Sequence, residues 1–154
     1  MAVLMNEIKP GSRGEDVLFA RRLLTAYGAG GLEANDLFDQ EMEQAVLRFK
    51  AQCGLDAGAA IDAKAWNCLA PVLNRDTISC NRERALKLAQ AFLHGKGFFR
   101  FKPDGLYGVD MQITVEIFQR ARGLRADGIW GRECWNAWFE DPQFQSNTVA
   151  AMAY

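Results

Sequence analysis

An internal repeat restricts the fold of this chain more than any other feature. Residues 13–69 align without a gap on residues 82–138, and these segments are called here the first repeat and the second repeat. Thirteen positions are identical, numbered in the first repeat as Arg13, Ala20, Leu24, Gly28, Leu37, Met42, Val46, Phe49, Gly54, Leu55, Ala57, Trp66 and Asn67. Self-similarity at a fixed spacing predicts two copies of one fold.

Each repeat has the apolar spacing of three helices, so we expect an all-α fold. In the first repeat, Ser12 and Glu15 have the spacing of a capping box, and the apolar residues that follow recur every three or four positions. Asp39 and Asp62 are suitable N-caps for a second and a third helix, and the second repeat has glycines at the corresponding positions.

The predicted organisation is a first domain at 8–72, a second domain at 80–141 and a C-terminal tail at 142–154. Residues 70–81, with their proline and their Asn-Arg-Asp run, are interpreted as a linker. Because a chain of about 60 residues buries a small share of its surface, each repeat alone is marginally stable. We therefore expect the two repeats to pack together.

The second repeat carries two turns of similar sequence, DGLYG at 104–108 and DGIWG at 127–131. Asp bonds its own backbone and Gly accepts a positive φ, so each Asp-Gly pair predicts a tight turn. Between the turns, apolar residues follow helical spacing and the run ends in FQ at 118–119 and GL at 123–124. The apolar residues of this helix are Met111, Val115 and Phe118 and, more loosely, Ile113 and Ile117.

This succession of motifs, closed by Trp138, resembles the bacterial peptidoglycan-binding domain of the three-helix type 1 family. The second repeat departs from that pattern at Met111, where the family usually has Thr, and at Thr114, where it usually has Ala. The first repeat has NDLFD at 35–39 and GAAID at 58–62 in place of the two turns, and we interpret it as a structural copy. The resemblance implies a non-catalytic protein that anchors or delivers a partner to the cell wall.

Charge also distinguishes the repeats, although the whole chain has a net charge of only −1. The first repeat has six Lys or Arg against nine Asp or Glu, giving −3, and the second has ten against six, giving +4. The second repeat therefore suits an anionic partner. Peptidoglycan offers sugar faces, which suit aromatic rings, and stem-peptide carboxylates, which suit the planar guanidinium of Arg.

We predict the ligand site around the two turns of the second repeat. Trp130 occupies the variable position of its motif and is expected to point outward, although it could instead cover the junction between the repeats. The ring of Tyr107 could pack while its hydroxyl reaches the groove. The other predicted ligand-binding residues are Arg122, Arg125, Arg132 and Asp127, with Arg120 in the same arginine cluster. Trp135 and Trp138 are expected in the core.

We expect no catalytic residue, metal or cofactor. The single histidine, His94, ends a helix, and the four cysteines lack metal-binding spacing. Turn formation explains Asp104 and Asp127. The alternative, a small hydrolase using Asp104, Glu116 or Asp127, requires a raised pKa that an exposed carboxylate rarely has.

The cysteines allow two interpretations, buried thiols or a Cys53–Cys68 disulfide between neighbouring helices. The aromatic run at 98–102 could mark single-stranded nucleic-acid binding. The acidic pI of about 5.9 argues against that, so we expect the run to pack against the first repeat.

No stretch has the length and apolarity of a membrane span, and the N-terminus lacks the features of a secretory signal. We therefore expect neither membrane nor nucleic acid as a partner. The sequence leaves the localisation open: the chain is expected to be synthesised in the cytoplasm, and action in the periplasm or cell wall would require non-classical export or lysis. The expected partner is peptidoglycan, through its glycan strand or stem peptide, with a separate hydrolase if cleavage is involved. The alternative is a protein-interaction module of a phage, secretion or hydrolase complex that keeps the fold without binding the wall.

Overall fold

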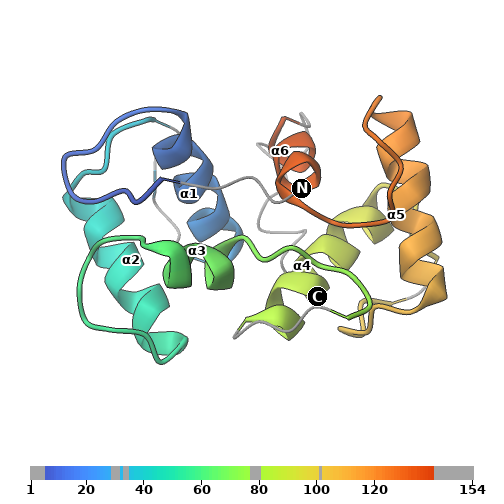
Figure 1. The fold of residues 1–154 in the computed structure, drawn as a ribbon, viewed down its shortest axis with the longest axis horizontal. Coiled ribbons are helices and arrows are strands. Elements are labelled where there is room, and N and C mark those ends of the chain that lie inside the picture. Colours follow the sequence, from blue (N-terminus) through green and yellow to red (C-terminus); the bar gives the residue numbers. More distant parts are fainter. Residues whose placement is uncertain (1–5, 29–31, 33–34, 77–80, 101, 141–154) are drawn as a thin grey trace.

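The computed structural model describes residues 6–28, 32, 35–76, 81–100 and 102–140, and this part of the chain forms six α-helices (Figure 1). The helices are α1 (Glu15–Ala26), α2 (Gln40–Gln52), α3 (Ala63–Leu69), α4 (Arg82–Gly95), α5 (Val109–Ala121) and α6 (Arg132–Phe139). The predicted all-α fold is confirmed. The predicted C-terminal tail lies outside the described residues.

The positions of the helices follow the sequence repeat. Both ends of α5 align with the ends of α2 when the second repeat is superposed on the first, and the start of α6 aligns with the start of α3. Figure 1 shows α1, α2 and α3 gathered at one end of the molecule and α4, α5 and α6 at the other.

The residues before the helices act partly as predicted. Asp39 Oδ1 accepts a hydrogen bond from Met42 N at 2.9 Å, and Asp62 Oδ1 accepts one from Ala65 N at 3.0 Å. The capping box expected at Ser12 is absent, because the Ser12 hydroxyl accepts a hydrogen bond from Lys9 N in the preceding turn. The N-cap of α1 is a nearby glycine, Gly14.

Each repeat is completed by a chain segment that precedes it. Ile8 pairs with Ile61 in an antiparallel bridge, and Leu73 pairs with Trp130 in the same way. The second bridge has two hydrogen bonds of 2.9 Å, and Leu73 is fully buried. The segment interpreted as a linker therefore contributes a residue to the core of the second repeat.

The four tryptophans are all buried, in agreement with the core positions predicted for Trp135 and Trp138. The Trp135 ring lies 5.7 Å from that of Trp138, and its indole N–H donates to the carbonyl of Pro71 at 3.2 Å. Phe98 packs edge-on against Phe118 of its own repeat, at 5.6 Å between ring centroids. The structure thus gives Phe98 a ring partner within the second repeat, where the sequence led us to expect packing against the first.

The Cys53–Cys68 disulfide, one of the two interpretations of the cysteines, is wrong. Cys53 is a half-buried free thiol and Cys134 a buried one, whereas Cys68 is disulfide-bonded. Burial raises the pKa of the Cys134 thiol to about 11, so it stays protonated at neutral pH. Among the described residues, no helix has the length and apolarity needed to cross a membrane.

The two repeats pack together, as predicted, through aromatic and charged side chains. Phe19 of α1 lies edge-on to Phe139 of α6, with ring centroids 5.6 Å apart. Arg132 of α6 donates to Asp16 of α1 at 2.6 Å, and its guanidinium lies 4.9 Å from the centre of the Phe19 ring. One arginine thus contacts both a carboxylate and an aromatic ring of the other repeat.

Replacement of Arg132 by glutamine is expected to lower the free energy of unfolding by about 1–2 kcal/mol, because a partly buried ion pair and a cation–π contact are lost together. Thermal unfolding followed by circular dichroism measures this loss. The control is Arg125→Gln, an exposed site, which should stay within about 0.5 kcal/mol of the parent protein. Equal stability of the two variants would contradict a stabilising role for Arg132 at the junction.

Candidate functional site

The second turn of the second repeat is held by a buried glutamine, Gln119. Its Oε1 accepts from Gly128 N at 3.0 Å, and its Nε2 donates to Asp127 Oδ1 at 2.8 Å and to the carbonyl of Ile129 at 3.0 Å. Asp127 Oδ1 also accepts from Ile129 N at 2.9 Å. Gly128 has a φ of +73°, which favours glycine. The turn is therefore a closed hydrogen-bonded unit.

The first turn repeats this arrangement around Gln90, which is fully buried. Gln90 Oε1 accepts from Asp104 N at 3.0 Å and Gly105 N at 2.9 Å. Its Nε2 donates to Asp104 Oδ1 and to the carbonyl of Leu106, both at 3.0 Å. The Leu106 N–H is the main cause of the lowered pKa of Asp104, with a further contribution from Gln90.

In the first repeat, buried cations stand at the positions of the two glutamines. Arg21 aligns with Gln90, and its Nη1 donates to the carbonyl of Leu37 at 3.0 Å and to Asp39 Oδ1 at 2.9 Å. The pKa of Asp39 is lowered, mainly by the Met42 N–H and further by Arg21.

Lys50 aligns with Gln119 and holds the second turn of the first repeat. Its Nζ donates to Asp56 Oδ2 at 3.1 Å and to the carbonyls of Gly58 and Ala60, both at 2.8 Å. The Lys50 ammonium is the main cause of the lowered pKa of Asp56. The first repeat has thus replaced the anchors of its turns rather than lost them. Arg21 in α1 and Lys50 in α2 are charged residues at buried positions of their helices. The sequence contains this signal, but we did not use it to predict what holds the turns.

Trp130 does not point outward, so this prediction is wrong. Its side chain is fully buried, and the rings of Phe92, Phe118 and Trp135 lie within 6.4 Å of it. Trp130 pairs with Leu73 in an antiparallel bridge, and both side chains are fully buried. The three packed rings all belong to the second repeat, so these contacts do not place Trp130 at the junction either.

Tyr107 is also turned inward. Its hydroxyl donates to the carbonyl of Gly128 at 2.5 Å and so ties the first turn to the second, instead of reaching a groove. Burial raises the pKa of the Tyr107 hydroxyl. This residue is therefore part of the support of the turns.

The predicted polar residues do not form one site. Arg132 is engaged at the junction with Asp16. Arg122 is half-buried, with its guanidinium 5.3 Å from the centre of the Phe118 ring. Arg125 is exposed just before the second turn, and Asp127 is exposed at the start of it. The Asp127 carboxylate accepts hydrogen bonds from Gln119 and from Ile129 N, and both of these stabilise the turn. Two of the six predicted residues, Arg122 and Arg125, remain as cations that could meet a ligand.

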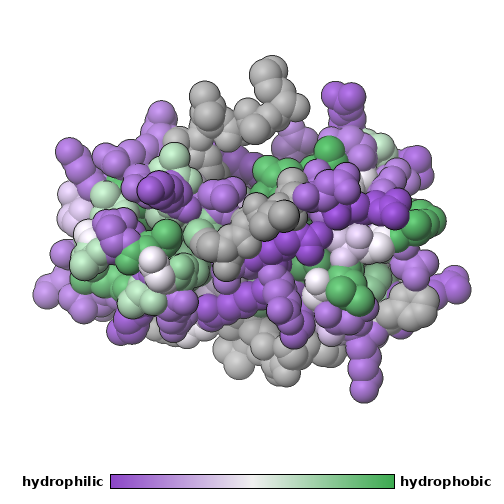
Figure 2. Space-filling view, turned by 60° about the horizontal axis from the view of Figure 1, so that its bottom comes forward, coloured by the Kyte–Doolittle hydropathy of each residue, from purple (hydrophilic) through white to green (hydrophobic). Residues whose placement is uncertain are grey.

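An exposed apolar surface that the sequence did not reveal runs along α5. It consists of Leu106, Val109, Ile113 and Ile117, which are 68%, 55%, 48% and 46% exposed, and is called here the α5 stripe. Residues four apart lie on one face of a helix, and Arg120 continues this face. Figure 2 shows apolar groups among hydrophilic ones at the end of the molecule that holds α5. The sequence analysis placed Ile113 and Ile117 loosely among the apolar residues of this helix, whereas the structure shows that both are exposed.

The carboxylates do not resemble a catalytic pair. Asp104 and Asp127 are each bonded within their own turn, and the pKa of Asp104 is lowered, whereas a general acid needs a raised one. Among the described residues, no three His, Cys, Asp or Glu side chains gather as metal ligands.

The chain is similar to one family of domains and to two known proteins. Residues 82–137 match the model of a family described as "Putative peptidoglycan binding domain". The chain is 27% identical over 153 residues to N-acetylmuramoyl-L-alanine amidase CwlM of Mycobacterium tuberculosis, covering 82% of this chain but only 36% of the amidase. The crystal structure of the Burkholderia AP3 phage endolysin is similar with a TM-score of 0.41 and 21% identity, covering 96% of this chain and 64% of the endolysin chain.

Proposed function

We propose, from the match of residues 82–137 to a peptidoglycan-binding domain, that this chain binds bacterial peptidoglycan through its second repeat and without catalysis. That match is the observation that carries the proposal. The net charge of +4 in the second repeat supports it, because the stem peptides of peptidoglycan are anionic. The role that follows is to bring an attached or associated protein to the cell wall.

The exposed residues favour stem peptides over sugars as the bound part. Sugar faces are suited by aromatic rings, but all large exposed apolar side chains in the described part of the chain are aliphatic. Arg120, Arg122 and Arg125 lie at the C-terminal end of α5 and beyond it, where each guanidinium can bind a carboxylate in bidentate geometry. The α5 stripe would contact the aliphatic parts of the peptide.

Removing the charges of the half-buried Arg122 and the exposed Arg125, both near the second turn, should weaken this binding. We expect purified sacculi to retain the intact protein, and Arg122→Gln with Arg125→Gln to reduce retention at least about tenfold, since hydrogen bonds to charged groups contribute about 1.5–3 kcal/mol each. Cosedimentation over a range of protein concentrations measures the change. Higher salt should weaken the remaining binding, because exposed charges are screened.

The matched control is Arg13→Gln with Arg22→Gln, the same charge change in the first repeat, which should leave retention unchanged. Equal losses in both double variants, or no retention of the intact protein, would contradict binding through the second repeat. No dye should be released from labelled sacculi; release that Asp127→Asn abolishes would show a hydrolase instead.

The α5 stripe favours a second candidate, docking of another protein. A row of exposed aliphatic residues beside cations is a common feature of protein interfaces. Ile113→Ser with Ile117→Ser should preserve the fold, because both side chains are about half exposed. Loss of a protein partner in this variant, with no sacculus binding by the intact chain, would support this candidate over the first.

A further inference from the structure

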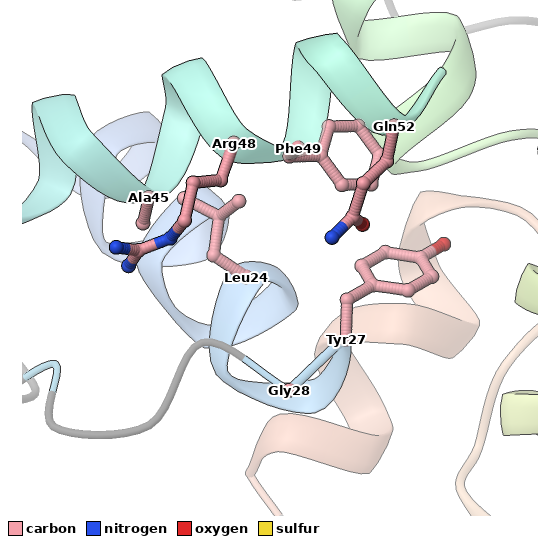
Figure 3. A pocket seen from close by; sticks show the side chains of 7 residues that line it. All are labelled: Leu24, Tyr27, Gly28, Ala45, Arg48, Phe49 and Gln52. Carbon is pink, nitrogen blue, oxygen red and sulfur yellow. The ribbon is translucent and has the colours of Figure 1, made fainter.

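A small cavity of about 80 Å³ opens between α1 and α2 of the first repeat (Figure 3). Its floor is formed by Leu24, Ala45 and Phe49, which are all buried. The end of α1, at Tyr27 and Gly28, forms one side. The cavity is far below the roughly 300–1,000 Å³ of drug-sized sites, so only a small group can enter.

The opposite side of this cavity carries unused hydrogen-bond donors. Arg48 and Gln52 line the cavity from neighbouring turns of α2. Figure 3 shows the Arg48 side chain passing Ala45 and Leu24 at one end of the cavity, and the Gln52 amide above the Tyr27 ring at the other end. Arg48 has neither an ion pair nor a hydrogen bond within the described part of the chain. Gln52 Oε1 accepts from Arg84 Nη1 at 2.9 Å, which directs the Gln52 amide nitrogen away from Arg84 and toward the cavity.

The second repeat lacks this combination at the equivalent place. Ile117 and Ala121 align with Arg48 and Gln52, so both polar side chains are missing there. The ring of Phe98 lies 5.6 Å from that of Phe118, the counterpart of Phe49. The cavity with its cationic side is therefore a property of the first repeat.

We propose that this cavity binds a short aliphatic carboxylate, of the kind that a C-terminal alanine presents. The methyl group lies on Leu24, Ala45 and Phe49, and the carboxylate accepts hydrogen bonds from Arg48 and Gln52. Both α1 and α2 end beside the cavity, and helix C-termini repel anions, so binding depends on the guanidinium group. The expectation that stem peptides are the source of this carboxylate rests on the proposed function.

Titration of the full chain with N-acetyl-alanine tests this proposal by amide chemical shifts. We expect saturable shifts at Gly28, Ala45 and Arg48 with a Kd of about 1–10 mM, the range for a ligand of this size. N-acetyl-alaninamide, which lacks the carboxylate, should bind at least about tenfold more weakly. Absence of saturable shifts, or equal binding of the amide, would overturn the proposal.

Variants locate the binding. Arg48→Gln should raise the Kd for N-acetyl-alanine at least about tenfold, and Arg22→Gln, the same change on α1 outside the cavity, should leave it unchanged. Both sites are on the helix surface, and unchanged spectra elsewhere verify the fold. If Arg48→Gln binds as the parent chain does, the cavity is not the site. Sacculus retention is a separate readout, so peptidoglycan binding can fail while the cavity still binds its carboxylate.

Discussion

Replacement of Trp130 by alanine is expected to lower the free energy of unfolding by about 3–5 kcal/mol, the usual range for a large buried aromatic side chain. Trp130 is fully buried, and the rings of Phe92, Phe118 and Trp135 pack around it. Alanine would leave a cavity at the centre of the second repeat. Urea unfolding followed by circular dichroism measures the loss.

A control substitution separates ring volume from hydrogen bonding. The Trp130 indole N–H has no hydrogen-bond partner in the described structure, so Trp130→Phe removes volume but breaks no bond. We expect it to be less destabilising than Trp130→Ala by at least about 1.5 kcal/mol. A stable Trp130→Ala protein that no longer binds sacculi would instead identify Trp130 as an exposed contact residue and contradict its burial.

Replacement of Gln119 by leucine should lower the free energy of unfolding by about 3 kcal/mol, because each buried group left without a partner costs about 1–3 kcal/mol. Leucine has a similar volume but cannot bond Gly128 N or the carbonyl of Ile129. Thermal and urea unfolding of this variant measure the loss. A loss below about 1 kcal/mol would show that Gln119 is not what holds the turn.

The first repeat supplies the matched rescue for this experiment. There Lys50 and Asp56 occupy the positions that align with Gln119 and Arg125. Gln119→Lys combined with Arg125→Asp should therefore recover at least half of the stability that Gln119→Leu loses. Equal stability of the two variants would contradict the interchange of anchors between the repeats.

Much of the fold was predictable because helices leave a strong periodic signal. The apolar spacing and the N-caps Asp39 and Asp62 located the helices, and the repeat predicted their number. The cap of α1 was misplaced, because a Ser–x–x–Glu pattern also fits a turn that uses the serine before the helix begins. The local sequence pattern did not distinguish a serine that caps the helix from one that bonds within the preceding turn.

The candidate site was less predictable. Trp130 lies in an extended pair, where the side-chain period is two, so helical periodicity gave no information about its orientation. The sequence did offer one indication that this position is buried, because the residue that aligns with Trp130 in the first repeat, Ile61, is apolar. The structure shows that Ile61 is buried as well. The resemblance to the family rested on the sequences of the turns and not on the buried side chains that hold them. For this reason we did not predict that Arg21 and Lys50 of the first repeat take the places of Gln90 and Gln119 of the second.

The bridge between Leu73 and Trp130 determines where the second half of this chain could be cut free. A fragment starting at residue 82, where the family match begins, would lose both backbone hydrogen bonds of Trp130 and the carbonyl of Pro71 that accepts from Trp135. Its tryptophan cluster would face water on that side. An excised second half has to start before Pro71, well upstream of its first helix.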